Sequence, residues 1–315
     1  MKNFGVIGVG GYIAPRHLKA IKETGHKVVC AMDKNDSVGI MDRYFPNAEF
    51  FTEFERFERH CEKLKMKDDP KQVDYVTICS PNYLHDAHIR FALRVGANVI
   101  CEKPIVLNPW NVENLLEIEK KTGKKIFTVL QLRYHPTIVE LREKIVKSNS
   151  SDKFEVDLVY MTPRGKWYFQ SWKSDIEKSG GLATNIGVHF FDMLTWIFGD
   201  VISQEVYLNE DKKMCGYLEL ENARVRWYLS VDREDLPAEN LDENKPFRSI
   251  KINGEELEFS TGFTDLHTKV YEETLKGNGF TISDALPSIK IVSEIRRMKV
   301  SSDSTSKNIS NELRK

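Results

Sequence analysis

The chain has little of what a secreted or membrane protein needs. It contains five cysteines, an odd number, which are widely spaced and mostly within apolar runs: Cys30, Cys61, Cys79, Cys101 and Cys215. Such cysteines are typical of reduced core thiols and not of a disulfide framework. The first residues, MKNFGVIGVG, enter a strand pattern directly, and no apolar run approaches the ~20 residues of a membrane helix. We therefore expect a cytoplasmic protein without a membrane partner.

An excess of charge of one sign is also missing. The 46 basic and 47 acidic residues give a formal net charge of −1, without a basic stripe or a long charged block. A nucleic-acid partner is therefore not expected. The length of 315 residues, with 41% hydrophobic content, exceeds the usual size of a single domain and predicts two.

Short β-rich runs alternate with helical stretches in the first part of the chain. The runs cover residues 4–8, 27–33, 74–80, 98–102 and 125–132. Amphipathic segments such as 87–95 and 112–121 separate them. This alternation predicts an α/β fold with a doubly wound parallel sheet of the Rossmann type. We place this domain at residues 1–125.

The second domain is placed at residues 126–300, and a linker-like stretch lies near 147–153. Hairpin signals are characteristic of this part of the chain. Two strands are expected in 213–231 around Glu221-Asn222, and two more in 247–259 around Asn253-Gly254. Helices are expected at 265–276 and 284–298. The pattern predicts an α+β domain with an open, mostly antiparallel sheet, and the polar tail 301–315 is expected to be disordered.

A glycine-rich turn closes the first strand and precedes a helical stretch. A dinucleotide pyrophosphate needs glycine backbone and unpaired helix N–H groups at this point of a doubly wound fold. The third glycine of the G-x-G-x-x-G pattern is replaced by Ile13. The predicted cofactor residues of the turn are Gly8, Gly10, Gly11, Tyr12 and Ile13.

Asp33 stands at the end of the second strand, where a carboxylate accepts hydrogen bonds from ribose hydroxyls and repels a 2′-phosphate. It favours NAD over NADP, and Asn35 is included in this part of the site. Two observations keep the alternatives open, since Lys34 could approach a phosphate and Asp33 could be only a helix or turn cap.

The next two strands end in Ser80-Pro81-Asn82 and in Glu102-Lys103-Pro104, at the edge of the sheet where ligands bind. A charged pair directly after an apolar run is expected to be half buried, and burial lowers the pKa of a lysine toward values useful for a base. His85, at the start of the next helix, is compatible with a cofactor contact or with ordinary capping. Gln131, beyond the following strand, is included as a cofactor residue.

The second domain contains one further candidate for acid–base chemistry, His189. Asn185, His189 and Asp192 are spaced i, i+4 and i+7, which would place all three on one face of a helix. The same face is otherwise apolar, so His189 is equally compatible with a hydrogen-bonded core residue.

Together, the glycine turn, Glu102-Lys103-Pro104 and the run Gly187-x-His189-x-x-Asp192 resemble the glucose-fructose oxidoreductase and inositol dehydrogenase (Gfo/Idh/MocA) family. The resemblance spans nearly the whole chain except the tail. Longer runs, such as GYIAPRHLKAIKETG, ICSPNYLH, RGKWYFQSWK and TNIGVHFFDMLTWIFG, resemble the branch that oxidises UDP-N-acetylglucosaminuronate at C3.

This resemblance implies NAD-dependent oxidation of the C3 hydroxyl to a 3-keto sugar in bacterial surface polysaccharide synthesis, including O-antigen. It implies a PLP-dependent aminotransferase as the next enzyme of the pathway, and a homodimer or homotetramer. In related enzymes NADH is either released or reoxidised in place by 2-oxoglutarate, and the sequence leaves both open. No metal site is expected.

The resemblance also assigns roles to residues. The lysine of the family's E-K-P motif is Lys103 and its second-domain histidine is His189. The family's aspartate four residues before that histidine is replaced by Asn185, so an Asp-His relay is not available. Because an amide cannot stabilise an imidazolium as a carboxylate does, Lys103 is the expected base, assisted by His189.

A uronate and a diphosphate need cations, which the segment 164–173 supplies among aromatic residues. The expected substrate residues are Lys103, Arg133, Arg164, Trp167, Tyr168, Lys173, Asn185 and His189. The alternative for this segment is an interdomain or subunit contact. Alternative functions are dehydrogenation of another nucleotide sugar or a free polyol, and a non-catalytic dinucleotide-binding regulator.

Overall fold

The computed structural model of the chain consists of two compact units. It describes residues 1–36, 39–148, 152–241, 245–258, 262–263, 265–301 and 312–313. The first unit comprises Met1–Gln131 and Asp265–Leu286, and the second comprises Leu132–Thr264 and Pro287–Lys315. The boundary thus follows residue 131, where the sequence analysis placed it after 125. Residues 149–151 of the expected linker, and 302–311 with 314–315 of the expected disordered tail, lie outside the described residues.

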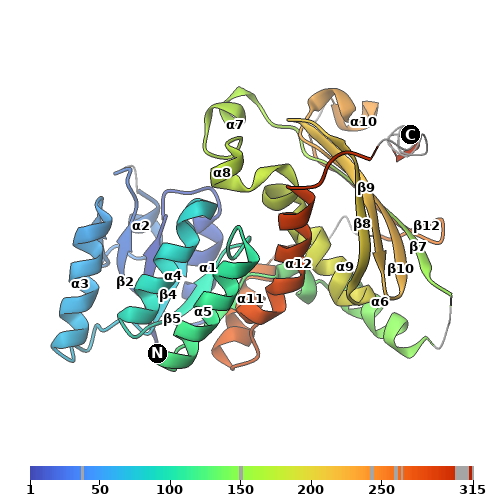
Figure 1. The fold of residues 1–315 in the computed structure, drawn as a ribbon. Coiled ribbons are helices and arrows are strands. Elements are labelled where there is room, and N and C mark those ends of the chain that lie inside the picture. Colours follow the sequence, from blue (N-terminus) through green and yellow to red (C-terminus); the bar gives the residue numbers. More distant parts are fainter. Residues whose placement is uncertain are drawn as a thin grey trace. The chain divides into compact units, whose positions relative to one another are not determined.

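The first unit is built on a parallel sheet of six described strands in the order β3-β2-β1-β4-β5-β6. Figure 1 shows this sheet in blue to green. The strands are β1 (Asn3–Ile7), β2 (Lys27–Met32), β3 (Glu49–Phe51), β4 (Tyr75–Ile78), β5 (Asn98–Cys101) and β6 (Ile126–Thr128). The strand order reverses between β1 and β4, and ligands of doubly wound sheets bind beyond the carboxyl ends of the strands at such a point.

Helices connect these strands. They are α1 (Ala14–Glu23), α2 (Gly39–Tyr44), α3 (Phe54–Met66), α4 (His85–Arg94) and α5 (Pro109–Thr122). Local sequence explains their limits, because α5 begins at Pro109 and ends before Gly123, whose φ of 67° suits a left-handed C-cap. The strands are buried on both faces, as a parallel sheet covered by helices requires.

The segment 265–286 returns to the first unit and completes it. It forms α11 (Leu266–Leu275), which packs against α1, and the start of α12 (Ile282–Ile295). Between them the chain pairs with the edge of the sheet, since Thr128 N donates to the Phe280 carbonyl at 2.9 Å and Phe127 bridges Thr281. The Rossmann unit is therefore not one continuous stretch of chain.

The second unit contains a mixed sheet in the order β12-β11-β7-β10-β9-β8. Its strands are β7 (Phe154–Met161), β8 (Val201–Asn209), β9 (Lys213–Leu220), β10 (Ala223–Ser230), β11 (Phe247–Ile252) and β12 (Glu255–Glu256). Only β7 and β10 pair in parallel among these described strands. The predicted fold class, a Rossmann sheet followed by a mostly antiparallel α+β domain, is confirmed.

Helices of the second unit are α6 (Pro136–Lys147), α7 (Lys166–Gln170), α8 (Ile176–Ser179), α9 (Val188–Phe198) and α10 (Ala238–Leu241). The apolar helix α9 covers one face of the sheet, where Phe191 meets Trp227 edge to face at 5.4 Å. The other face holds an apolar cluster that includes Tyr228, Cys215 and, from the chain's last described turn, Leu313. Across the described residues, no helix is both long and apolar enough to cross a lipid bilayer.

Candidate active site

The glycine turn after β1 has the close approaches that a dinucleotide cradle requires. Gly8 adopts a φ of 89°, and a Cβ there would lie 2.8 Å from the backbone of Cys79 and Ser80. A Cβ on Gly10 would lie 3.1 Å from the carboxylate of Asp33. A larger residue is therefore excluded at Gly8, and at Gly10 it would require the Asp33 side chain to shift. The helix that follows begins at Ala14, so Ile13, in place of the usual third glycine, is the N-cap of α1.

Asp33 is part of this turn. Its Oδ2 accepts a hydrogen bond from the Gly10 N–H at 2.8 Å, and its Oδ1 accepts one from the Asn35 N–H at 2.9 Å. These bonds are those expected if Asp33 caps the turn. A carboxylate has about four lone-pair sites, however, so Asp33 can also accept hydrogen bonds from ribose hydroxyls. Tyr12 projects into solvent, 89% exposed, beside the glycines. The turn thus fits a dinucleotide, with Asp33 placed where a ribose would lie.

The ends of β4 and β5 are joined by a histidine. The ring of His85 is buried, with Nδ1 2.7 Å from the carbonyl oxygen of Pro104 and Nε2 2.9 Å from that of Ser80. Both nitrogens thus face backbone carbonyls. A neutral ring has one N–H and donates to one of these carbonyls, so His85 lies between the Ser80-Pro81-Asn82 exit and the Glu102-Lys103-Pro104 exit in a positioning role.

Glu102 is at the centre of a buried hydrogen-bond network. Its Oε1 lies 2.8 Å from Nε2 of His17 in α1 and 3.2 Å from Nε2 of His267 in α11. Its Oε2 accepts the backbone N–H of Lys103 at 3.2 Å. Burial alone would raise the pKa of Glu102, but the hydrogen bonds from the two histidines outweigh burial and hold that pKa well below its usual range. The carboxyl group is therefore ionised.

The network continues beyond His17. Nδ1 of His17 lies 2.9 Å from the hydroxyl of Tyr271, which lies 2.8 Å from Oγ1 of Thr77. Burial lowers the pKa of His17, opposed only in part by Glu102, so the ring is neutral. A neutral ring that donates from Nε2 to Glu102 accepts at Nδ1 from Tyr271, which in turn accepts from Thr77. Each of these three groups therefore donates one hydrogen bond to the next group in the network.

Among the described residues, one cluster has the residue types and spacing that could hold a divalent metal. It consists of His17, Glu102 and His267, whose potential ligand atoms lie within 4.8 Å of one another. Their ligand atoms, however, are separated by ordinary hydrogen-bond distances of 2.8 and 3.2 Å, and the bond from Tyr271 fixes the ring of His17. We therefore interpret the group as a hydrogen-bond network. Sequence reasoning missed His17, His267 and Tyr271, because no local spacing connects them to Glu102.

Lys103 follows Glu102 at the carboxyl end of β5 and is half buried, as its position after an apolar strand predicted. The peptide bond between Lys103 and Pro104 is cis. Gln131 lies in a short 3-10 turn after β6, and its Oε1 is a buried acceptor without a partner among the described residues. Such an atom could accept a hydrogen bond from a cofactor amide, and the cofactor contact of Gln131 stays a prediction.

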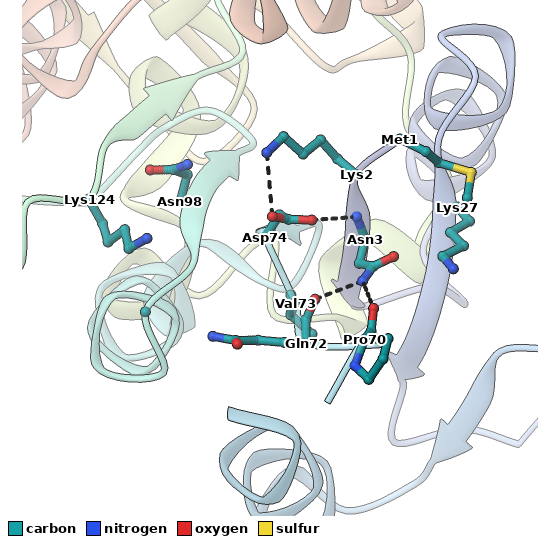
Figure 2. Close-up of a pocket in the computed structure, with 11 residues that line it drawn as sticks. Met1, Lys2, Asn3, Lys27, Pro70, Gln72, Val73, Asp74, Asn98 and Lys124 are labelled. Carbon is teal, nitrogen blue, oxygen red and sulfur yellow. Dashed lines mark hydrogen bonds and ion pairs between the residues drawn. The ribbon is translucent and has the colours of Figure 1, made fainter. Parts of the chain in front are cut away.

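A hollow of about 520 Å³ opens at the opposite edge of the first sheet, where the strands begin. Figure 2 shows its lining, which includes Lys2, Lys27, Asp74 and Lys124. Its one carboxylate, Asp74, is engaged within the protein, since the backbone N–H of Asn3 donates to it at 2.8 Å and Lys2 pairs with it at 3.5 Å. Because doubly wound sheets bind ligands at the carboxyl ends of their strands, this hollow is not the candidate site.

In the second unit, Asn185 lies in a π-helical turn, Ala183–Gly187, directly before α9. The wider turn changes the regular i, i+4 spacing that the sequence analysis assumed, and π-turns are frequent at functional sites. Asn185 Nδ2 donates to the hydroxyl of Tyr168 at 3.2 Å. Burial raises the pKa of Tyr168. His189 is half buried in the first turn of α9.

Asp192 is not a third polar group of that site. It is buried and accepts two hydrogen bonds from the guanidinium of Arg133, at 2.8 and 3.0 Å. Arg133 is 5% exposed, which favours a structural ion pair over the substrate contact expected for it. A buried arginine and aspartate at this spacing stabilise each other only as a pair.

The segment 164–173 collects cations among aromatic rings. Nζ of Lys173 lies 5.1 Å from the ring centre of Trp167 and 4.9 Å from that of Trp172. Burial lowers the pKa of Lys173, and the charge of Arg164 lowers it further. Among the described residues no carboxylate forms an ion pair with Arg164 or Lys173. Two cations of one segment without a counter-ion among the described residues favour an anionic ligand.

The chain matches two family models that together cover most of its length. Residues 2–130 match "Oxidoreductase family, NAD-binding Rossmann fold" of GFO_IDH_MocA, and residues 153–301 match "Oxidoreductase family, C-terminal alpha/beta domain". Among curated relatives, the chain is 26% identical over 268 residues to the putative oxidoreductase YteT of Bacillus subtilis, covering 77% of this chain and 61% of that protein. The chain therefore covers less than two thirds of the length of YteT, and the same is true of two further curated relatives, a D-glucoside 3-dehydrogenase and an inositol 2-dehydrogenase.

Solved structures give a more extensive match. The WlbA (WbpB) dehydrogenase of Thermus thermophilus, in complex with NAD and alpha-ketoglutarate, is 50% identical with a TM-score of 0.92, over 96% of this chain and 97% of that one. Its complex with NAD and UDP-GlcNAcA matches at 49% identity and a TM-score of 0.92, over 97% and 98%. The WlbA dehydrogenase of Bordetella pertussis, at 19% identity, a TM-score of 0.76 and 94% of each chain, shares the fold.

Proposed function

The chain belongs to the Gfo/Idh/MocA oxidoreductase family, and we propose that it oxidises the C3 hydroxyl of UDP-N-acetylglucosaminuronate with NAD. The observation that carries this proposal is the 49% identity, over 97% of the chain, to a dehydrogenase crystallised with NAD and UDP-GlcNAcA. The described site residues are chemically suited to both molecules.

The first unit provides the cofactor site. The cradle of Gly8, Gly10 and Gly11, the carboxylate of Asp33 and the buried acceptor of Gln131 would hold NAD. Ser80, Pro81 and Asn82 are proposed as further contacts at the end of β4. When bound, NAD supplies the acceptor for the hydride that leaves C3.

Lys103 is proposed as the base. Its neutral amine accepts the proton of the C3 hydroxyl and becomes an ammonium, while the C3 hydrogen leaves with its electron pair and the C3–O bond becomes a carbonyl. His189 and Asn185 are proposed to orient the sugar. Asn185 is fixed by Tyr168, and an amide so held can direct a hydroxyl but cannot accept its proton.

The cation pair of Arg164 and Lys173 is proposed to bind the acidic part of the substrate. A half-buried lysine that faces another cation gains from a carboxylate or a phosphate in its vicinity, and a guanidinium can bind either group through two hydrogen bonds. Trp167 and Tyr168 would complete this loop around the ligand. The proposal explains why the loop has two close cations and no acidic partner among its described residues.

Reoxidation of the cofactor by 2-oxoglutarate is part of the proposal. Its support is the T. thermophilus complex that contains NAD together with alpha-ketoglutarate. A 3-keto sugar is a substrate for amination, so a PLP-dependent aminotransferase acting next in surface polysaccharide synthesis is proposed as the pathway partner. A homodimer or homotetramer in the cytoplasm completes this proposal.

The test is a comparison of substrates with the purified full-length protein. NADH formation at 340 nm, or 2-hydroxyglutarate formed when 2-oxoglutarate is present, is expected with UDP-GlcNAcA and not with UDP-GlcNAc or free inositol. Activity only with a free polyol or another nucleotide sugar would overturn the substrate assignment. NAD binding without turnover of any sugar would favour a regulator.

One variant tests the base. Lys103→Ala should lower kcat by more than 100-fold and change the Kd for NAD by less than about 3-fold, because a base contributes roughly 10²–10⁴ to the rate. The matched control is Lys124→Ala, which removes a lysine of the same unit from the hollow in Figure 2. Its activity should equal that of the parent protein. Unchanged kcat in Lys103→Ala would contradict the assignment.

A further inference from the structure

We propose that His17, Glu102 and His267 maintain a buried, uncompensated negative charge beside Lys103, and that this charge sets the pH at which the lysine amine can accept a proton. The inference rests on the proposed role of Lys103. In this proposal His17, Glu102 and His267 are positioning residues for the base Lys103.

The charge is located by the hydrogen bonds. Glu102 is 6% exposed, yet three N–H groups point at its two oxygens, from His17, His267 and the backbone of Lys103. Hydrogen bonds to the ionised form are what keep a buried carboxylate charged. The orderly chain from Thr77 through Tyr271 to His17 supplies the donor at one oxygen and polarises it toward the carboxylate.

The charge is also uncompensated by the residues that hold it. His17 is completely buried, lies 5.1 Å from the ring of His267 and is near the cation of Arg16, all of which oppose its protonation. The bond between His17 and Glu102 is thus a charge-assisted hydrogen bond with a neutral donor, although its geometry is that of an ion pair. His17 and Glu102 together therefore carry one full negative charge.

Other groups around the carboxylate do not cancel it. The titratable groups that face Glu102 or its histidines belong to α1, β4, α4, β5 and α11, and they are Arg16, Cys79, His85, Cys101, Lys103 and Tyr271. Burial raises the pKa of the Cys79 and Cys101 thiols and of Tyr271, and burial lowers that of His85, so these groups are neutral. Lys103 is the cation next to Glu102 along the chain.

The consequence is electrostatic. A negative charge favours the ammonium form of a neighbouring lysine, so removing it should allow the amine to lose its proton at lower pH. At an effective dielectric constant near 20, the attraction between a partly buried carboxylate and a neighbouring ammonium corresponds to a shift of about 1 pH unit. The charge of Glu102, and not its shape, should cause the shift.

The experiment measures the amine directly. The full-length protein is labelled with an acetylating reagent at a series of pH values, and the modified fraction of Lys103 is read by mass spectrometry against exposed Lys125 in the same digest. We expect the midpoint pH of Glu102→Gln to fall by about 1 unit. Glu102→Asp, which keeps the charge and shortens the side chain, should remain within about 0.3 unit of the parent.

Two further variants cover the case that changes at Glu102 prevent folding. His267→Met removes one donor, while the carboxylate stays ionised at the pH of lysine labelling. Its charge is then less offset by hydrogen bonds, so the midpoint should rise by a smaller amount than it falls in Glu102→Gln. His267→Gln keeps an N–H donor and should restore the parent value. The matched control is His88→Gln, which removes another buried histidine of the first unit. The ring of His88 is hydrogen-bonded to Ser80 and not to Glu102, so this variant should leave the midpoint unchanged.

The outcomes are distinct. An unchanged midpoint in Glu102→Gln, or an equal shift in Glu102→Asp, would overturn the proposal and leave the network with a purely structural role. If Glu102→Gln does not fold, an unchanged midpoint in His267→Met does the same. Because labelling needs no sugar, a parent protein that does not oxidise UDP-GlcNAcA would refute the proposed function without affecting this result.

Discussion

Acidification from about pH 7.5 to about pH 5 should destabilise the first unit through one histidine in particular, His88. Its ring is buried in α4, stacked on Phe54 at 4.8 Å, with Nδ1 2.9 Å from Oγ of Ser80. Burial lowers the pKa of His88 from 6.5 to about 4, and His85 adds to this shift because two neighbouring imidazolium ions would repel each other. The imidazole is therefore neutral in the folded protein under conditions where it is charged in the unfolded chain.

The sign and the magnitude follow from this difference. Because the folded-state pKa lies below the unfolded-state value, the unfolded chain binds the proton first as the pH falls. Stability is complete above about pH 6.5 and is lost between about pH 6.5 and about pH 4. The full displacement corresponds to about 3 kcal/mol, and at about pH 5 the loss is about 2 kcal/mol.

The assay must report on the first unit alone. Hydrogen exchange at increasing urea, read on peptides that contain β4 and β5, gives the free energy of unfolding of that unit at each pH. His88→Gln cannot be protonated, so its loss between about pH 7.5 and about pH 5 should be about 2 kcal/mol smaller than that of the parent. His26→Gln is the control, because His26 is half exposed and its pKa is less displaced. Equal losses in parent and His88→Gln would refute the reasoning.

Three other substitutions test the two units separately. Gly10→Ala places a methyl group 3.1 Å from the Asp33 carboxylate, so the Kd for NAD should rise at least 10-fold in a fluorescence titration, while the second unit keeps its stability. Arg133→Met leaves Asp192 buried without its partner and should cost about 3–5 kcal/mol in urea unfolding, a loss that Arg133→Met with Asp192→Leu should largely reverse. Tyr168→Phe removes the acceptor of an amide hydrogen bond, so kcat should fall about 5- to 10-fold with an unchanged Kd for NAD, and an unchanged kcat would separate Tyr168 from the reaction.

Local patterns were sufficient for the Rossmann sheet and its binding edge. The β-rich runs, the glycine turn and Asp33 depend on neighbours in sequence, so their spacing alone indicates strands, a tight turn and a carboxylate at a strand end. The hairpin at Asn253-Gly254 was predicted for the same reason, since both residues adopt the positive φ that the turn requires. Strand β3 was missed, because three residues at a sheet edge give no periodic signal.

Features that depend on distant residues were not predictable in this way. Glu102 meets His17 and His267 across long stretches of chain, and nothing near the E-K-P motif marks them as partners. Similarly, nothing in the sequence near Arg133 indicated that it forms an ion pair with Asp192 in α9. The π-helical turn at Asn185 was missed because the sequence pattern was interpreted with regular helical spacing.

The return of residues 265–286 to the first unit has a consequence for how the protein is made. A ribosome releases the glycine turn, the E-K-P motif and β6 early, but the edge pairing of Phe127 and the imidazole of His267 must wait until residues 132–264 of the second unit have been synthesised. Until then the nascent sheet has an open edge, and Glu102 lacks one of its donors. A fragment ending at Gln131 should therefore be a poor NAD-binding cassette, and newly made chains should depend on chaperones until translation is nearly complete.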